Sequence, residues 1–209
     1  MNYLAYKKIL LFASILFLVS HSTYSQDEDD KWVVGAGVNV VDIRSPYGII
    51  GIVKDYGNAS FEDLNASGSL VRVFVGRYLA NGITVQASAS ANEIQKGWWY
   101  STGDPLTNDS FFALDSKFKY DLNYLLKRST GPFDPFVLVG GGYSKIGETS
   151  NVNIAAGWGF NLWFSRGIGL NFQSDYNHNP KSSKTDYFQH SIGLVFKLST
   201  SPRFRWRGR

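Results

Sequence analysis

The feature that most constrains this chain is an alternation between two kinds of side chain along residues 186–198. The alternate positions that include Phe188, Leu194 and Phe196 are mostly large and apolar, whereas the positions between them, such as Ser191, are mostly small or polar. A period of two is typical of a β-strand whose two faces meet different surroundings. We therefore predict a two-faced strand here.

The same alternation recurs in seven earlier segments, so strands account for most of the chain. None of the sequence after residue 26 contains 18 consecutive apolar residues, the length typical of a membrane-spanning helix. Strands of this length match the roughly 9–11 residues that a tilted strand needs to cross a bilayer. The earlier segments are residues 32–43, 70–79, 83–94, 112–124, 134–146, 152–164 and 168–177.

Charged side chains indicate which faces lie inside. In residues 112–124 one face carries Phe112, Leu114 and Phe118, whereas the opposite face carries two lysines and two aspartates. An apolar core cannot hold these charges without partners, but the polar interior of a membrane barrel can. The predicted interior charge network consists of Arg72, Asp115, Lys117, Lys119, Asp121 and Asp175.

These faces predict an all-β fold: an eight-stranded antiparallel transmembrane β-barrel, wound as an up-and-down meander. The alternative is a soluble, lipocalin-like barrel, in which the large apolar side chains lie inside. Residues 152–164 argue against it, because Trp158, Phe160, Leu162 and Phe164 follow one another on the predicted outer face. In residues 134–146 three successive glycines leave the inward phase open.

The connections between strands also favour a membrane barrel. Short turns at one end and longer loops at the other are typical of outer-membrane barrels, and aromatic belts mark both membrane interfaces. The predicted turns are residues 80–82, 126–133 and 165–167, and the predicted loops are 44–69, 95–111, 147–151 and 178–185. The predicted belts contain Trp98, Trp99, Tyr100 and Tyr176 at the loop side and Trp32, Tyr124 and Trp163 at the turn side.

The N-terminus has the layout of a secretory signal peptide. Lys7 and Lys8 precede an apolar run at residues 9–19, and small residues stand at the −3 and −1 positions of a cut before Gln26. An uncleaved anchor is the alternative. We expect a cleaved signal at residues 1–25, an acidic lead at 26–31, the barrel at 32–198 and a basic tail at 199–209.

Charge and cysteine content exclude several classes of function. The net charge of +4 comes from the two ends, because residues 1–25 carry two lysines and the last eleven residues carry four arginines, with no acid in either. The intervening segment is therefore slightly acidic, which argues against a nucleic-acid partner. The chain has no cysteine, which excludes disulfides and thiolate chemistry.

Four pieces of sequence resemble a known family. They are WVVGAGVNVVD at residues 32–42, GRYLANG at 76–82, FDPFVLVGGGY at 133–143 and YFQHSIGLVFK at 187–197. Together they resemble the N-terminal eight-stranded barrel of OmpA-type outer-membrane proteins, over about residues 31–198. The resemblance implies the outer membrane of a Gram-negative bacterium, contact with outer-membrane lipid and lipopolysaccharide, and recognition of the last strand by the barrel-insertion machinery.

The chain also departs from this family. OmpA-type proteins commonly continue into a periplasmic domain that holds peptidoglycan, whereas this sequence has eleven residues after its last predicted strand. We therefore do not expect peptidoglycan binding by such a domain. The tail residues Arg203, Arg205, Arg207 and Arg209 are expected either to touch anionic headgroups or a periplasmic partner, or to be a disordered remnant where such a domain once attached.

No pattern in the sequence predicts catalysis, a metal site or a cofactor. The glycine clusters at residues 35–37, 140–142 and 157–159 lack the strand-to-helix context and the Lys-Ser/Thr ending of a phosphate loop. A lipid-side hydrolase would need a serine, a histidine and an acid at the outer rim. His190 has the required outward position, but the adjacent Ser191 points to the opposite face.

We therefore predict a non-catalytic outer-membrane barrel with a structural or interaction role in the envelope. An interior of this size is filled by side chains, so we expect a plug rather than a pore. Alternatives are a subunit docked laterally in a larger envelope assembly, favoured by the small outward residues Ala87, Ala89 and Ala91, and, less favoured, a narrow channel or a lipid-modifying enzyme.

Overall fold

A closed barrel of eight strands accounts for nearly all of the chain that the structure, a computed structural model, describes. The described residues are 31–42, 67–94, 109–126, 131–165, 167–181 and 186–198, with the side chains of 67–70 excluded. The strands are β1 Trp32–Asp42, β2 Ser67–Ala80, β3 Ile83–Ile94, β4 Asp109–Asp121, β5 Phe133–Ile146, β6 Thr149–Trp163, β7 Ile168–His178 and β8 Tyr187–Leu198. Within these ranges no helix is long and apolar enough to span a membrane.

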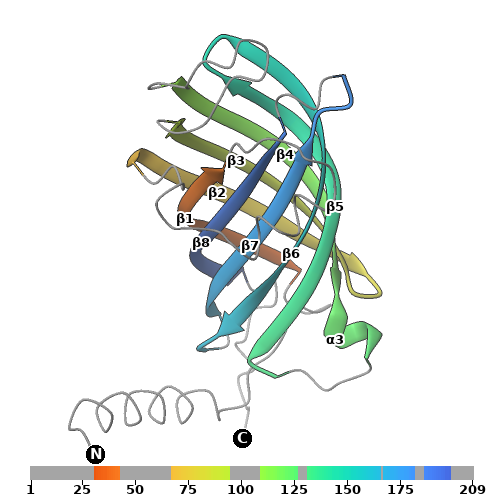
Figure 1. The fold of residues 1–209 in the computed structure, drawn as a ribbon. Coiled ribbons are helices and arrows are strands. Elements are labelled where there is room, and N and C mark those ends of the chain that lie inside the picture. The colour runs from red at the N-terminus through yellow and green to blue at the C-terminus, as the bar shows by residue number, and fades with distance from the viewer. Residues whose placement is uncertain are drawn as a thin grey trace, which may run out of the picture.

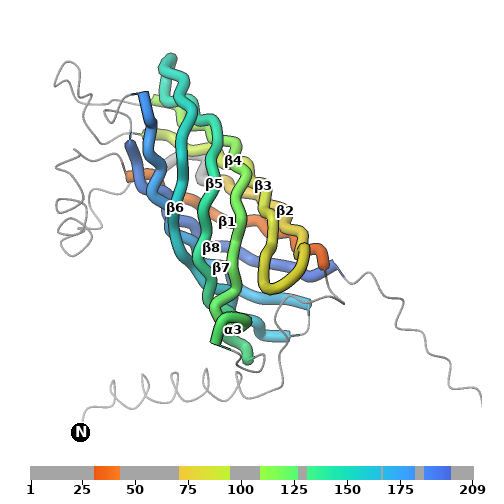
Figure 2. Tube along the Cα trace, turned by 90° about the vertical axis from the view of Figure 1, so that its right-hand side faces the viewer, coloured from red at the N-terminus to blue at the C-terminus, as the bar shows by residue number. Residues whose placement is uncertain are grey.

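Every strand pairs antiparallel with its neighbours in sequence, and the first pairs with the last. The β1–β8 register runs from Trp32 opposite Leu198 to Asp42 opposite Phe188, which closes the sheet. Figures 1 and 2 show the tilted strands wrapping around the barrel. Closure leaves no strand edge unpaired, as a membrane-spanning sheet requires. The predicted eight-stranded up-and-down meander is confirmed.

One end of the barrel carries the β2–β3, β4–β5 and β6–β7 connections, and we call it the turn end; the other is the loop end. The β2–β3 turn contains Asn81 and Gly82 with φ of 52° and 77°. Two successive positive φ values are typical of a tight hairpin turn. The β5–β6 connection at the loop end is also tight, with only Gly147 and Glu148 between the strands, so the loop predicted at 147–151 is wrong.

The prediction of a strand over residues 112–124 is also wrong at its end. β4 stops at Asp121, whose carboxylate accepts a hydrogen bond from the backbone N–H of Asn123 at 2.7 Å. This contact caps a single helical turn, α3, at Leu122–Leu125. An aspartate at the N-cap satisfies an N–H that the helix leaves unpaired, so the local hydrogen bond prevails over the alternating pattern.

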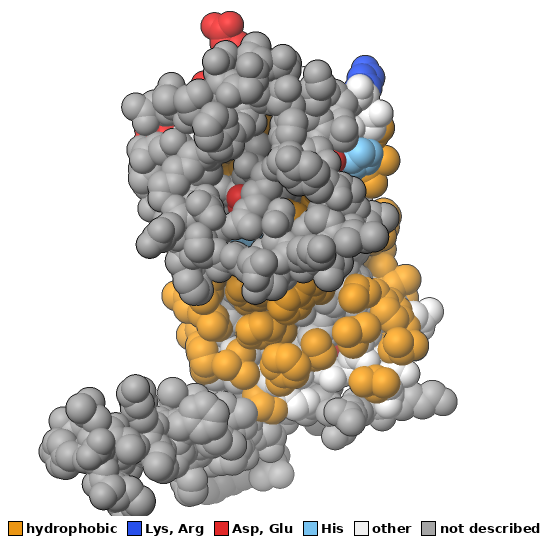
Figure 3. All heavy atoms as spheres, in the orientation of Figure 1, with side chains coloured by type: hydrophobic (Ala, Val, Ile, Leu, Met, Phe, Trp, Pro, Cys, Tyr) orange, Lys and Arg blue, Asp and Glu red, His pale blue; other side chains and the backbone are white. Residues whose placement is uncertain are grey.

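The outer wall is apolar, as expected for a transmembrane barrel. Outward side chains include Phe118, Val139 and Ile154, each more than half exposed. Figure 3 shows hydrophobic side chains gathered as a belt around the visible face of the barrel. Residues 134–146, whose phase the sequence left open, point their even-numbered residues inward, for example Phe136 and Leu138.

The interior is layered rather than uniformly polar. One cluster of buried apolar side chains lies at the loop end and consists of Val41, Ile94, Phe111, Ala113, Ile146 and Tyr187. A second lies toward the turn end and consists of Val33, Phe74, Trp163 and Val195. Trp163 is therefore inside the barrel, and its assignment to an interfacial belt is wrong. Trp98, Trp99 and Tyr100 lie outside the described residues.

Glycines on the inner wall give the buried rings their space. An added Cβ at Gly159 would lie 2.6 Å from Cζ of Phe136, and one at Gly35 would collide with the ring of Phe74. An eight-stranded barrel has an interior just wide enough for side chains to fill. The glycine clusters in β1 and β6 thus have a packing role in the interior.

Candidate functional site

The centre of the interior is a hydrogen-bonded charge network between the two apolar clusters. Lys117 of β4 donates to Asp175 of β7 at 2.6 Å and lies 3.4 Å from Asp115, with all three side chains almost fully buried. Gln173 donates to the same oxygen of Asp175 at 2.8 Å. Ser88 of β3 donates to Asp115 at 3.4 Å. One lysine therefore neutralises charge on two strands that are not neighbours.

Arg72 of β2 supplies the second buried cation of this layer. Its guanidinium donates to the hydroxyl of Ser191 on β8 and lies over the ring of Phe74, with 5.7 Å between Cζ and the ring centroid. Asp175 and Asp115 attract its charge. The layer thus holds two cations and two carboxylates, so its formal charge is balanced.

Neutral polar side chains extend the network across the barrel. Gln86 donates to Gln173 at 3.1 Å, and Gln189 donates to Ser90 at 2.7 Å. These contacts join β3 to β7 and β3 to β8 through the lumen. Buried polar groups need such partners, because leaving one unpaired costs on the order of 1–3 kcal/mol.

Toward the turn end, two cations lie against aromatic rings. The ammonium of Lys119 is 3.7 Å from the centroid of Phe136, and that of Lys197 is 4.2 Å from the centroid of Trp163. The indole N–H of Trp163 donates to Asp134 at 3.4 Å. A cation over a ring face is attracted by the ring quadrupole, and burial strengthens that attraction.

The structure places the predicted site residues in three groups. The central layer contains Arg72, Asp115, Lys117 and Asp175. Lys119 lies nearer the turn end, against the ring of Phe136. Asp121 caps α3 at the rim. The tail residues Arg203, Arg205, Arg207 and Arg209 lie outside the described residues.

Sequence reasoning did not assign Asp134 or Lys197 to the interior charges. Asp134 begins the segment whose phase the glycines obscured, whereas Lys197 shares the small or polar face of residues 186–198 but is not in the predicted network. The register was the missing information, because β5 pairs with β4 so that Phe136 stands opposite Asp121. Extending the inward phase of β4 across that pairing places Asp134 inside.

The two histidines outside the signal region have separate partners on the outer wall. Nδ1 of His190 lies 2.9 Å from the hydroxyl oxygen of Ser174 on β7. Its partner in this contact is therefore on the neighbouring strand. His178 lies 2.9 Å from Asp186, which also accepts from the hydroxyl of Tyr176 at 2.7 Å. In the described part of the chain, no group of three or more metal-ligating side chains is assembled.

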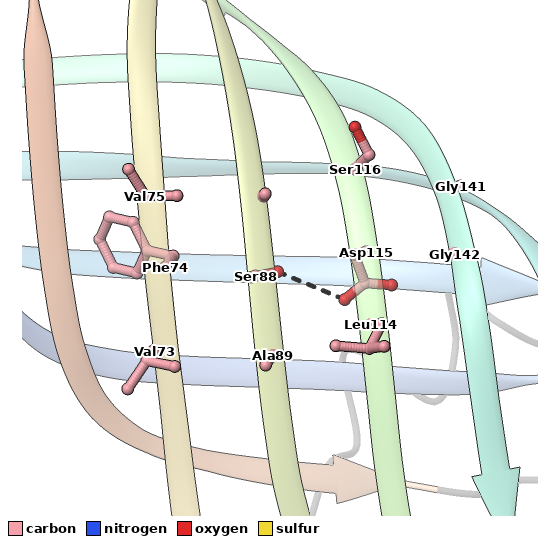
Figure 4. A pocket seen from close by; sticks show the side chains of 11 residues that line it. Val73, Phe74, Val75, Ser88, Ala89, Leu114, Asp115, Ser116, Gly141 and Gly142 are labelled. Carbon is pink, nitrogen blue, oxygen red and sulfur yellow. Dashed lines mark hydrogen bonds between the residues drawn. The ribbon is translucent and has the colours of Figure 1, made fainter.

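A groove of about 650 Å³ runs across the outer wall over β2 to β5 (Figure 4). Small residues on neighbouring strands line it, including Ala89, Ser116 and Gly141. Val73 and Val75 line its β2 side, and Leu114 of β4 also lines it. Two of the three small outward residues predicted on β3, Ala87 and Ala89, therefore line a wider depression in the wall.

Comparison with known proteins places the fold among outer-membrane barrels. No family model matches the chain, and no curated protein matches it. Neisserial surface protein A matches with a TM-score of 0.52 and 13% identity, over 80% of this chain and 97% of that one. The outer membrane protein OprG from Pseudomonas aeruginosa matches with a TM-score of 0.52 and 11% identity, over 81% and 96%. The chain has the eight-stranded barrel fold of outer-membrane proteins.

Proposed function

We propose that this protein is a non-catalytic outer-membrane barrel of a Gram-negative bacterium, with a structural or interaction role in the envelope. The observation that carries the proposal is the filled interior, in which a neutral charge network lies between two apolar clusters. A barrel that carries solutes needs a continuous aqueous path, and such a path exists in much wider barrels. The role therefore belongs to the surfaces of the barrel.

The envelope location is supported by the wall and by the fold. The outward side chains form an apolar belt, which is stable only against hydrocarbon. The similar solved structures include outer-membrane barrels. In this proposal the signal at residues 1–25 exports the chain, the insertion machinery recognises β8, and the folded barrel contacts outer-membrane lipid, lipopolysaccharide and envelope proteins.

Conductance in a planar bilayer tests the closed interior. The wild-type protein should insert without large, stable openings. The double variant Phe111→Ala/Trp163→Ala, which truncates one ring in each inner cluster, should show more frequent openings. The matched pair Phe160→Ala/Trp158→Ala truncates one half-buried and one exposed ring on the outward face of β6, and this variant should remain closed. Large, stable openings of the wild-type barrel would refute the proposal.

A second candidate function is that of a subunit docked laterally in a larger outer-membrane assembly. The groove over β2 to β5 favours it, because small residues let two transmembrane surfaces approach closely. In this case Ala89→Trp, which fills the groove, should abolish co-purification of a partner after mild detergent extraction. Ala156→Trp, on the exposed face of β6, should not. Equal recovery of a partner with both variants would exclude the groove as the docking site.

A further inference from the structure

The helical turn at the end of β4 exposes three successive large side chains. Tyr124, Leu125 and Leu126 are 50%, 59% and 58% exposed. Figures 1 and 2 show α3 at the turn end, where it extends past the end of β4. Single exposed apolar residues are common on protein surfaces, whereas a contiguous exposed apolar patch often marks a contact surface.

Hydrogen bonds join this helical turn to β5 and to the β2–β3 turn. The side-chain amide of Asn123 donates to the backbone carbonyl of Phe133 on β5 at 2.8 Å. The hydroxyl of Tyr124 donates to the side chain of Asn81 in the β2–β3 turn at 3.1 Å. Leu126 closes the turn by donating its N–H to the carbonyl of Leu122 at 3.0 Å. The two leucines are therefore presented by a fixed piece of backbone.

The patch continues the lipid-facing wall. Tyr124 packs on Gly82: a Cβ added to Gly82 would lie 2.8 Å from the Cβ of Tyr124. Ile83 follows that glycine and is exposed, as is Phe133, whose carbonyl binds Asn123. Above them, Phe118 belongs to the apolar belt. Exposed apolar side chains thus lead from the outer wall to α3, so a bilayer that covers this wall would also reach α3.

We propose that α3 and Leu126 form a membrane anchor, in which Leu125 and Leu126 insert into the boundary between headgroups and acyl chains at the turn end. Tyrosine at position 124 suits this depth, because its ring is apolar and its hydroxyl polar. Interfacial segments of this kind bury their apolar side chains about 5–10 Å into the boundary. Because the turn is fixed to β5 and to the β2–β3 turn, the anchor sets how deeply the barrel sits.

Site-directed spin labelling tests the anchor directly, since the chain has no cysteine and each variant carries a single thiol. The full chain is reconstituted in vesicles of phosphatidylcholine and phosphatidylglycerol, with a nitroxide at Leu125→Cys. Phe118→Cys marks the lipid-facing wall, and Glu148→Cys marks the exposed turn at the loop end. Collision rates with oxygen and with a water-soluble nickel chelate then report the depth of each label.

The anchor predicts a ratio of oxygen to nickel collisions at position 125 well above that at 148 and nearer to that at 118. A ratio equal to that at 148 would overturn it, because the turn would then project into water. A turn covered by a protein partner gives this second result as well, since the vesicles contain no partner. The test does not depend on conductance, so it can fail while the proposed function stands.

Lipid quenching provides an independent measurement with a different label. A fluorophore at Leu125→Cys should be quenched more by lipids brominated near the carboxyl end of the acyl chain than by lipids brominated near its methyl end. Absence of quenching by either lipid would overturn the anchor. Heat-modifiable gel migration of each variant verifies that the barrel is folded before its label is interpreted.

Discussion

At the scale of single residues, Lys117 has the most demanding position in the barrel. Its ammonium forms ion pairs with both Asp175 and Asp115, and all three side chains are almost fully buried. A buried ion pair contributes modestly to stability when it is intact, because both charges lose their hydration. Removal of one partner is costly, because the remaining charge is left uncompensated in a medium of low polarity.

Replacement of Lys117 by Met should therefore destabilise the barrel by about 3–5 kcal/mol. Urea unfolding in vesicles measures the change, with Lys145→Met on the exposed face of β5 as the control, expected within about 0.5 kcal/mol of wild type. Adding Asp175→Asn to Lys117→Met should recover part of the loss, because one uncompensated charge is removed. A loss no greater than that of the control would contradict the network.

The residue scale also shows where the sequence was least informative. Alternation identifies the face on which a side chain lies, so it placed Arg72 and Asp175 inside. It does not give height in the barrel, which depends on register between strands. The apolar clusters therefore could not be predicted from the sequence, and Trp163 was expected in an interfacial belt rather than in the interior. The height of a side chain depends on how its strand pairs with its neighbours, so it cannot be read from the pattern of one strand.

At the scale of elements, strands were predictable and the helical turn α3 was not. Leu122 and Tyr124 continue the alternation of β4 into α3, so the pattern contains no stop signal. Asp121 ends the strand through a hydrogen bond to Asn123 at 2.7 Å, a local contact without periodicity. The β2–β3 hairpin was predictable because Asn-Gly is a strong signal for a two-residue turn.

Gly82 offers a test of how closely the turn-end elements are packed. Its φ is 77°, and an added Cβ would lie 2.8 Å from Cβ of Tyr124. Gly82→Ala should therefore destabilise the barrel by about 1–3 kcal/mol in vesicle unfolding. Gly131→Ala is the matched control, because an added Cβ there meets nothing within 4 Å. Equal stability of the two variants would contradict both the strain of the positive φ and the close contact with Tyr124.

At the scale of the whole molecule, the barrel places polar groups inside and apolar groups outside. This arrangement was predictable because charged inner faces and aromatic outer faces recur on several strands. The burial of Arg72 and Lys117 and the exposure of Phe118 confirm it. The solved structures compared above share the barrel fold at an identity of 11–13%. Partners of the loops could not be predicted, because recognition depends on loop conformation rather than on periodicity.

The most direct test of this account is the period of lipid exposure along β6. Single cysteines at Asn153, Ile154, Ala155 and Ala156 are spin-labelled, and the folded barrel is reconstituted in vesicles. We predict that labels at 154 and 156 collide readily with oxygen, as in hydrocarbon, and that labels at 153 and 155 are immobile and shielded, in agreement with their burial. Absence of a period of two, or the opposite phase, would contradict the transmembrane barrel.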